Sequence, residues 1–384
     1  RHVRAARAGP SAATRAPSTA PRVAVGRAAH RRAGQMEKYR QFADGGTGVN
    51  PFTPLWSHHK TSLPMRVLKV LIMFPIALLR LLFFSAAMLC IALTEVVCAL
   101  IPIGVLRYPL YCVLAPIFCR VALLSLGVFP SGDALADHRR LKIAPPKSGG
   151  AQAFKASHGT LVFANQQGIT DVLFLGLRLC PTFVFVARDG SISAHGLLGA
   201  LRRASSTELP APAPKAATLA EVAQDAHSGW RGPVVVFAEG ANTTGGCVLA
   251  WKAKTFEGVT SLEKPVGTAV ASVQYSKTGA YTPHHTVGTA MRHLFWLCFQ
   301  PYHTVEGLWL PPSEAMTAIR GKPIAEQWAL LRTLLVRMIK GAVEVEVPAE
   351  RHGEFAAYWD AAQRKGYTRQ QQQQPPPAGS KKRA

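Results

Sequence analysis

One long apolar stretch constrains the fold of this chain more than any other feature. From Val67 to Phe129 the sequence is apolar apart from a few charged side chains, namely Lys69, Arg80, Glu95, Arg107 and Arg120. A transmembrane helix needs about 20 mainly apolar residues, whereas a helix of a soluble domain keeps a polar face that this stretch lacks. We therefore expect residues 67–129 to form a membrane helical hairpin, with one helix over 67–94 and the other over 96–129.

The same stretch leaves the depth of insertion open. Arg80 would be costly at the centre of a bilayer, and three prolines would kink the second helix, namely Pro102, Pro109 and Pro116. Two crossings and a partly interfacial, membrane-embedded hairpin both fit these residues.

The two ends of the chain have biased compositions. Residues 1–35 contain eight arginines and no Asp or Glu, which resembles a mitochondrial transit peptide. Their prolines break an amphipathic helix and the first methionine is Met36, so we interpret 1–35 as a disordered arm or a non-native extension. Residues 36–66 form a polar N-terminal segment, and 346–384 a tail of low complexity from 363. Its end, Lys381-Lys382-Arg383-Ala384, matches a dilysine retrieval pattern or is a solvated basic tail.

A polar linker over 131–152 leads into a domain over 153–345, in which strand and helix patterns alternate. Apolar runs predict strands over 160–164, 182–187, 234–238, 266–275 and 305–310. Helical periodicity predicts helices over 171–179, 193–204, 218–227 and 324–340. Strands separated by helices indicate an α/β fold with a mixed or largely parallel sheet flanked by helices.

Charge and cysteine content narrow the class of partner. The 384 residues carry a formal net charge of +23, which suits phospholipid headgroups or phosphorylated substrates. No nucleic acid is expected, because the basic residues do not interleave with aromatic ones. The seven cysteines form no paired framework, which indicates reduced thiols. No metal is expected either, and we interpret His284 and His285, in a proline-containing loop, as surface histidines.

Two short polar motifs stand where predicted strands end. The first is Asn165-Gln166-Gln167-Gly168-Ile169-Thr170-Asp171, and the second is Phe237-Ala238-Glu239-Gly240-Ala241-Asn242-Thr243-Thr244. Ligands of open α/β sheets bind at the carboxyl ends of strands, so we expect both motifs to face one pocket. Glu239 and Gly240 bind substrate or form a plain turn. The run from Asn242 to Thr244 holds a phosphate or is a plain polar loop, and Arg188 pairs with a phosphate or is a solvated surface residue.

On these residues the chain resembles the PlsC-type glycerolipid acyltransferases, over about residues 155–310. Those enzymes have a His and, five positions later, an Asp at the start of a helix, and a Glu-Gly-Thr type turn after a strand. Asp171 matches that Asp, Glu239-Gly240 matches that turn, and Val184-Phe185-Val186-Ala187-Arg188 looks like the acceptor-binding block. The resemblance implies a membrane-anchored acyltransferase that uses acyl-CoA as co-substrate, and no other cofactor.

A closer resemblance begins at Met36. The runs Met36-Glu37-Lys38-Tyr39, Asp44-Gly45-Gly46-Thr47-Gly48 and Pro51-Phe52 resemble those of the fungal oleoyl-CoA:lysophosphatidic acid acyltransferases. This likeness covers most of residues 36–360. It implies transfer of an acyl group such as oleoyl to lysophosphatidic acid, which gives phosphatidic acid for glycerolipid synthesis. It also implies residence in the endoplasmic reticulum membrane and on lipid droplets, with the catalytic domain in the cytosol.

Gln166 departs from the wider family, which has its base at this position. A neutral amide cannot take a proton at physiological pH, although the fungal subgroup also tends to lack the histidine. Three hypotheses stay open: Asp171 is the base, directly or through water; His195 or His158 folds into the vacant place; or the chain is inactive. The expected catalytic residues are Asp171 and Gln166. The expected substrate-binding residues are Asn165, Arg188, Glu239, Gly240, Asn242, Thr243 and Thr244.

Other classes of protein remain as alternatives. A catalytically inactive lipid-binding or lipid-droplet scaffold would explain Gln166. A transporter fits the apolar stretch but would need more than two segments and repeats across the membrane midplane. A mitochondrial matrix enzyme would require residues 1–35 to be a native targeting segment. The sequence predicts no particular oligomeric state.

Overall fold

The computed structural model describes residues 39–55, 62–143, 154–209, 211–212, 217–262, 267–276 and 280–373. Contacts divide the chain into a short N-terminal unit, Arg1–Gln41, and a main unit, Phe42–Ala384. Only Tyr39–Gln41 of the first unit is described, at the 3-10 helix η1 (Arg40–Phe42). The expected arm over 1–35 and the basic end of the tail lie outside the described residues.

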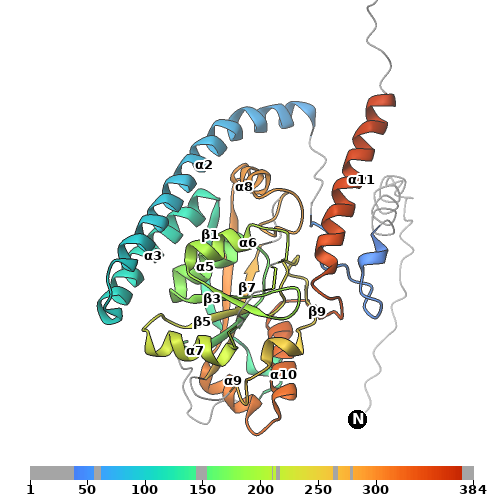
Figure 1. Ribbon diagram of the computed structural model, residues 1–384. Coiled ribbons are helices and arrows are strands. Elements are labelled where there is room, and N and C mark those ends of the chain that lie inside the picture. The colour runs from blue at the N-terminus through green and yellow to red at the C-terminus, as the bar shows by residue number, and fades with distance from the viewer. Residues whose placement is uncertain are drawn as a thin grey trace, which may run out of the picture. The chain divides into compact units, whose positions relative to one another are not determined.

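A mixed sheet forms the centre of the main unit (Figure 1). It has seven strands in the order β1-β8-β7-β2-β5-β3-β4. Its strands are β1 (Val128–Leu135), β2 (Leu161–Ala164), β3 (Thr182–Val186), β4 (Ile192–His195), β5 (Val234–Phe237), β7 (Thr268–Tyr275) and β8 (His303–Leu310). The central strands β7, β2, β5 and β3 are parallel, whereas β8 and β4 run antiparallel to their inner neighbours. β6 (Cys247–Val248) and β9 (Val343–Glu344) make a separate pair. The predicted α/β class with a mixed sheet flanked by helices is confirmed.

Helices cover both faces of the sheet because its central strands are apolar on both faces. All residues of β2 and β5 are buried, as is typical of parallel strands. Val162 and Phe163 point to opposite faces and join different cores. The core around Val162 includes α3 (Gly104–Ser125), α5 (Ile169–Leu179), α6 (Leu197–Ala204) and α8 (Ala290–Cys298). The core around Phe163 includes α4 (His138–Leu141), α7 (Leu219–Ser228), η2 (Ala253–Phe256), α9 (Pro312–Ile319) and α10 (Ile324–Met338).

Several segments differ from the expected secondary structure. The expected C-terminal tail over 346–384 contains the helix α11 (Arg351–Gln373), in which Phe355 is buried, and the helices α8 and α9 were not predicted. The predicted helix over 193–204 is the edge strand β4 followed by α6, because residues 192–195 pair with β3 and Gly196 separates the two elements. The expected linker over 131–152 begins inside β1, which pairs with β8 through a register shift between Pro130 and Gly132. An edge strand tolerates such residues, and its pairing with a strand far along the sequence leaves no local signal. Residues 144–153 lie outside the described part of the chain.

The predicted apolar hairpin is present as two helices, α2 (Leu63–Ala99) and α3 (Figure 1). Both are long and apolar enough to cross a membrane, judged by length and composition. One stripe of α2 is buried, namely Ala77, Phe84, Ala87, Ile91, Thr94 and Cys98. Most other apolar side chains of α2 are exposed, with Leu71 at 67% and Leu82 at 65%. The hairpin therefore packs on the α/β domain with one face and presents apolar side chains on the other.

Three charged side chains of the hairpin bond backbone groups at the ends of helices in the α/β domain. Arg80 donates from Nη1 to the carbonyls of Cys298 (3.1 Å) and Gln300 (2.6 Å), at the end of α8. Glu95 accepts from the backbone N–H of Leu198 (2.9 Å), in the first turn of α6. Arg107 donates to the Gly229 carbonyl (3.1 Å). Cations suit the carboxyl end of a helix and anions its amino end, so these pairings fasten the hairpin to the domain.

Candidate active site

The two polar motifs meet at the carboxyl ends of the parallel strands (the carboxyl edge of the sheet), because β2 and β5 are parallel neighbours. The backbone N–H of Gln166 donates to Glu239 Oε1 (3.0 Å), and its side-chain Nε2 donates to Asn242 Oδ1 (2.9 Å). The N–H of Thr243 donates in return to the Gln166 carbonyl (2.8 Å). Motifs that lie 73 residues apart in sequence at Gln166 and Glu239 therefore form one hydrogen-bonded unit.

Asp171 lies in the first turn of α5 and is completely buried. Its Oδ2 accepts from the N–H groups of Gln167 and Gly168 (2.9 Å for Gly168), and its Oδ1 accepts from the Tyr275 hydroxyl (2.6 Å). Burial raises the pKa of Asp171 to about 7, while the Tyr275 hydroxyl and the two backbone donors act in the opposite direction. All three neighbours donate, so the geometry accommodates the carboxylate form.

Glu239 joins the motifs to the segment that follows them. Its Oε2 accepts from the Leu249 N–H (3.0 Å), while its Oε1 accepts from Gln166 as above. Burial raises the pKa of Glu239 to about 8, and the backbone hydrogen bonds from Leu249 and Gln166 oppose that rise. Gly240 has a φ of 74°, and a Cβ there would lie 3.2 Å from the Val186 carbonyl, so the turn requires glycine. A direct role of Glu239 and Gly240 in substrate binding stays a prediction.

The other residues expected in the site are also buried and engaged. Asn165 exchanges two hydrogen bonds with the backbone of Val273 on β7 (3.0 and 2.8 Å). Asn242 donates to the carbonyls of Ala204 (3.1 Å) and His285 (2.9 Å). The N–H of Thr244 donates to the Pro51 carbonyl (3.0 Å). The backbone N–H groups of Thr243 and Thr244 are thus satisfied inside the protein in this conformation.

One buried acceptor of the first motif is left without a partner. Within the described part of the chain, Gln166 Oε1 is buried and has no hydrogen-bond partner, although its Nε2 is bonded. Buried side-chain oxygens are normally paired. The amide oxygen of Gln166 is therefore available to a donor such as a ligand hydroxyl.

A third loop, which the sequence analysis did not assign to the site, also lies against it. After β7 the chain passes through His284 and His285, and the His285 N–H donates to the Gln167 carbonyl (2.8 Å). His285 is buried, so its interpretation as a surface histidine is wrong, and His284 is half-buried. The His284 ring lies edge-on to the Tyr275 ring, with centroids 5.6 Å apart. The available signal was position: a histidine pair soon after a strand parallel to β2 belongs at the same edge.

The N-terminal segment from Phe42 to Leu55 packs against the second motif. Besides the Pro51 contact with Thr244, the Phe52 ring is fully buried, 5.0 Å from the His352 ring and 5.8 Å from the Phe355 ring. Asp44 holds the turn that follows it and accepts from the Glu346 N–H (3.0 Å). The segment from Phe42 to Leu55 thus folds onto the loop that carries Thr244 and onto α11 (Arg351–Gln373).

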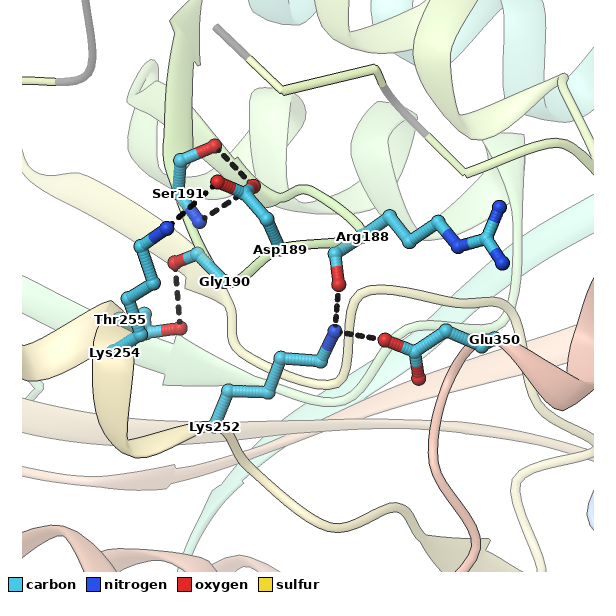
Figure 2. Close-up of polar contacts among 8 residues, drawn as sticks. All are labelled: Arg188, Asp189, Gly190, Ser191, Lys252, Lys254, Thr255 and Glu350. Atoms are coloured by element: carbon cyan, nitrogen blue, oxygen red, sulfur yellow. Dashed lines mark hydrogen bonds and ion pairs between the residues drawn. The ribbon is translucent and has the colours of Figure 1, made fainter.

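Arg188 stands apart from this buried network. It is exposed, in the turn between β3 and β4, and its backbone carbonyl accepts from Lys252, which also pairs with Glu350 (Figure 2). Its guanidinium points away and makes no contact with the other residues drawn (Figure 2). Nearby, Lys254 pairs with Asp189 (2.8 Å). Carboxylates thus partner both lysines, and the Arg188 side chain extends towards solvent.

The histidines proposed as substitutes for the missing base lie elsewhere. His158 precedes β2 and therefore lies at the amino end of the parallel strands, whereas the motifs lie at their carboxyl ends. Its Nδ1 accepts from the Gly232 N–H (3.0 Å). His195 lies on β4 opposite Phe183, near the start of β3, and its Nε2 contacts Ser193 Oγ (3.0 Å). The structure therefore brings neither imidazole next to Gln166.

Neither the possible metal ligands nor the comparisons with known proteins identify the function of the site. Among the residues described above, no group of three or more His, Cys, Asp or Glu side chains is arranged to hold a metal ion. No family model matches the chain, and neither does any curated protein or solved structure.

Proposed function

We propose that the chain is a membrane-bound acyltransferase that transfers a fatty acyl group, such as oleoyl, from acyl-CoA to lysophosphatidic acid to give phosphatidic acid. The observation that carries the proposal is the union of the two motifs at the carboxyl edge of the sheet, through the bonds from Gln166 to Glu239 and Asn242. Ligand sites of open α/β sheets occupy this edge. An apolar hairpin fastened to the same domain supports a lipid substrate.

The reaction joins the acceptor hydroxyl to the thioester carbonyl carbon. A hydroxyl must be held and deprotonated, and the developing oxyanion needs donors. In the proposal Gln166 Oε1 accepts from a donor group of the bound substrates, since that oxygen has no partner among the described residues. Asn165, Asp171, Glu239 and Gly240 hold the loops in register. The exposed Arg188 binds the acceptor phosphate, together with the loop of Asn242, Thr243 and Thr244 after a local opening.

The hairpin is proposed to lie in one leaflet with its exposed apolar face in the lipid. The turn between α2 and α3 is held to the domain, because Arg107 bonds the Gly229 carbonyl and a Cβ on Gly104 would lie 2.9 Å from that oxygen. Exposed Met291 and Trp296 on α8, which packs against α2, extend the apolar surface. This arrangement suits a domain on the cytosolic face of the endoplasmic reticulum and on lipid droplets, whose single lipid layer admits no crossing.

Labelling of the hairpin turn tests this placement. A cysteine at Leu100, which is 78% exposed, is expected to react with an impermeant maleimide added outside intact microsomes. Wild-type protein gives the background from the native thiols. Labelling of Leu100→Cys only after the membrane is permeabilised would mean that the turn has crossed the bilayer.

A lipid-binding scaffold is the second candidate, and the burial of both motif carboxyls favours it. Asp171 and Glu239 have their oxygens occupied by protein donors, as in a purely structural network. A scaffold would bind lysophosphatidic acid or a lipid surface without turnover.

Activity measurements separate the two candidates. Membranes containing the protein are incubated with a panel of lysophospholipids and labelled acyl-CoAs, beside Asp171→Asn, Glu239→Ala and Arg188→Ala. Because Arg188 is exposed, Arg188→Ala is expected to fold normally and to raise KM for lysophosphatidic acid, whereas the exposed Arg202→Ala is a matched control without effect. Absence of any acyl transfer by folded wild-type protein would reject the acyltransferase in favour of the scaffold.

A further inference from the structure

The motif carboxyls cannot reach an acceptor hydroxyl in this structure. Asp171 is fully buried, with both oxygens filled by Gln167, Gly168 and Tyr275. Glu239 is equally enclosed and bridges Gln166 and Leu249. A general base must come within hydrogen-bond reach of the proton that it takes, so another group has to serve a hydroxyl that arrives from the surface.

The loop of the second motif comes to the protein surface at Gly245 and Gly246, the two half-exposed glycines that follow Thr244. Gly245 has a φ of 68°, and a Cβ built there would lie 2.3 Å from Gln167 Oε1 and 3.1 Å from His284 Nε2. The imidazole of His284 and the side-chain amide of Gln167 therefore lie against the backbone of Gly245, where a side chain would collide with them. His284 thus lies beside Gly245, the residue that follows the second motif.

We propose that His284 is the base that takes the proton of the acceptor hydroxyl, in place of the imidazole that the Gln166 position lacks. This inference rests on the proposed acyl transfer and adds the residue that performs its proton transfer. Neutral histidine accepts a proton near physiological pH, because its ordinary pKa is about 6.5.

The loop that carries His284 is fixed to both motifs. The neighbouring His285 donates its N–H to the Gln167 carbonyl (2.8 Å), and its carbonyl accepts from Asn242 Nδ2 (2.9 Å). A Cβ on Gly168 would lie 3.2 Å from His285 Cβ, so the two loops pack closely. Such anchoring holds the adjacent imidazole in place without a conformational search.

The groups that face His284 set its charge. The Tyr275 ring packs against it, and the Tyr275 hydroxyl donates to Asp171. His293 on α8 and the adjacent His285 also lie near, and burial lowers the pKa of both. Asp171 is linked to the His284 ring through the Tyr275 hydroxyl, and a carboxylate there favours a protonated His284 after the transfer.

The remaining histidines of the described chain are less suitable. They are buried, or bonded at a distance from the motifs, namely His138, His158, His195, His227, His285, His293, His303 and His352. Among the histidines that the structure describes, His284 alone combines partial exposure with a position beside Gln167 and Gly245.

The proposed step balances without another reactant. The acceptor oxygen forms a bond with the thioester carbonyl carbon while its proton moves to His284 Nε2. The tetrahedral intermediate then breaks its C–S bond, and the protonated imidazole returns the proton to the departing CoA thiolate. The products are the ester and free CoA, and His284 ends as it began.

Kinetics of His284→Ala and His284→Gln test the proposal on the full-length protein in membranes. Loss of a base lowers kcat by about 10²–10⁴-fold with little change in KM, and added imidazole is expected to restore part of the rate of His284→Ala. Wild-type kcat/KM should fall at acidic pH, where an imidazole base is protonated, and His284→Ala should lack that acidic limb. His227→Ala, which removes an exposed imidazole at the opposite edge, is expected to behave like wild type.

The outcomes separate this inference from the proposed function. An active wild type with His284→Ala within threefold of it would overturn the role of His284 and leave the acyltransferase intact. An inactive wild type across the whole lipid panel would reject the acyltransferase, and His284 as its base with it. Thermal unfolding of each variant shows whether a lost rate reflects lost folding.

Discussion

The carboxyl end of the sheet and the apolar hairpin differ in which side chains they bury. The sheet end buries polar side chains, whereas the hairpin exposes apolar ones. At the sheet edge, polar groups such as Asp171, Glu239 and Asn242 are buried, and nearly every polar atom is bonded. Along α2, large apolar side chains are exposed while Arg80 and Glu95 find protein partners. Buried polar groups are stable only when paired, and a large exposed apolar face marks a surface that another phase or partner covers. The first region is therefore ordered by contacts within the protein, whereas the second presents an apolar face that another phase or partner would cover.

Replacing phenylalanine in each region should give the largest contrast in stability. Phe52→Ala is expected to lose about 3–5 kcal/mol of unfolding free energy, because the ring is fully buried against His352 and Phe355. Phe83→Ala, at a site 53% exposed on α2, should change it by less than about 0.5 kcal/mol. Chemical unfolding in mild detergent measures both. Equal losses would mean that the N-terminal segment does not pack as described.

Removing the Glu239 carboxyl should have the next largest effect. Glu239→Ala leaves the buried N–H groups of Gln166 and Leu249 without acceptors, which costs about 2–4 kcal/mol in total. The exposed Glu257→Ala is the matched control and should be neutral. Unfolding of purified variants reports the difference, and a neutral Glu239→Ala would argue against the hydrogen-bonded union of the motifs.

The buried carboxyls should also make stability depend on pH. The folded pKa values of Asp171 (about 7) and Glu239 (about 8) lie above the ordinary values of 3.8 and 4.5. The folded state therefore binds more protons than the unfolded state between about pH 4 and 8, and stability falls as pH rises through 7 to 8. The loss between pH 6.5 and 8.5 should be about 2 kcal/mol. Glu239→Gln, which cannot ionise, should flatten this slope, and an unchanged slope would contradict the assignment.

Buried histidines act in the opposite direction at lower pH. Burial lowers the pKa of His303 and His352 to about 4, so between about pH 4 and 6.5 the unfolded state takes up protons that the folded state refuses. The two effects offset each other in that range. The decline above pH 6.5 is then the part of the wild-type curve to which the carboxyls contribute most.

The smallest effect on stability is expected on the exposed face of the hairpin. Leu82→Ser should alter unfolding in detergent by less than about 0.5 kcal/mol, yet weaken membrane binding by about 1–3 kcal/mol. Leu123→Ser on α3, where the side chain is fully buried, should reverse this pattern. Flotation with liposomes measures binding. Unchanged flotation of Leu82→Ser would indicate that another surface contacts the lipid.

The sequence was most informative where the signal is local. The apolar runs around Val162 and Val235 predicted buried parallel strands, and their adjacent ends placed Gln166 and Glu239 at one edge. A helix was predicted over 218–227, and Thr218 caps α7 there with a capping box to Glu221. Each of these features depends on neighbours within a few residues, or on the general geometry of parallel strands.

The sequence was least informative where partners come from distant segments. The family pattern pairs the Gln166 position with Asp171, but Gln166 Nε2 bonds Asn242 and Asp171 takes the Tyr275 hydroxyl. The approach of His284 to Gly245 depends on how the loop after β7 folds back, which no periodicity encodes. Arg80 looked like a cost to a membrane helix, and the carbonyls that satisfy it lie 218 and 220 residues away.

Acyl transfer by the purified protein tests the central claim most directly. The protein, in detergent micelles or liposomes, is given labelled oleoyl-CoA and lysophosphatidic acid. The account predicts labelled phosphatidic acid from the wild type. It predicts a rate reduced at least tenfold in Asp171→Asn, because the Oδ1 and Oδ2 atoms of the native Asp171 position the first motif. Folded wild-type protein that binds the lipids but forms no labelled product with any lysophospholipid would contradict it.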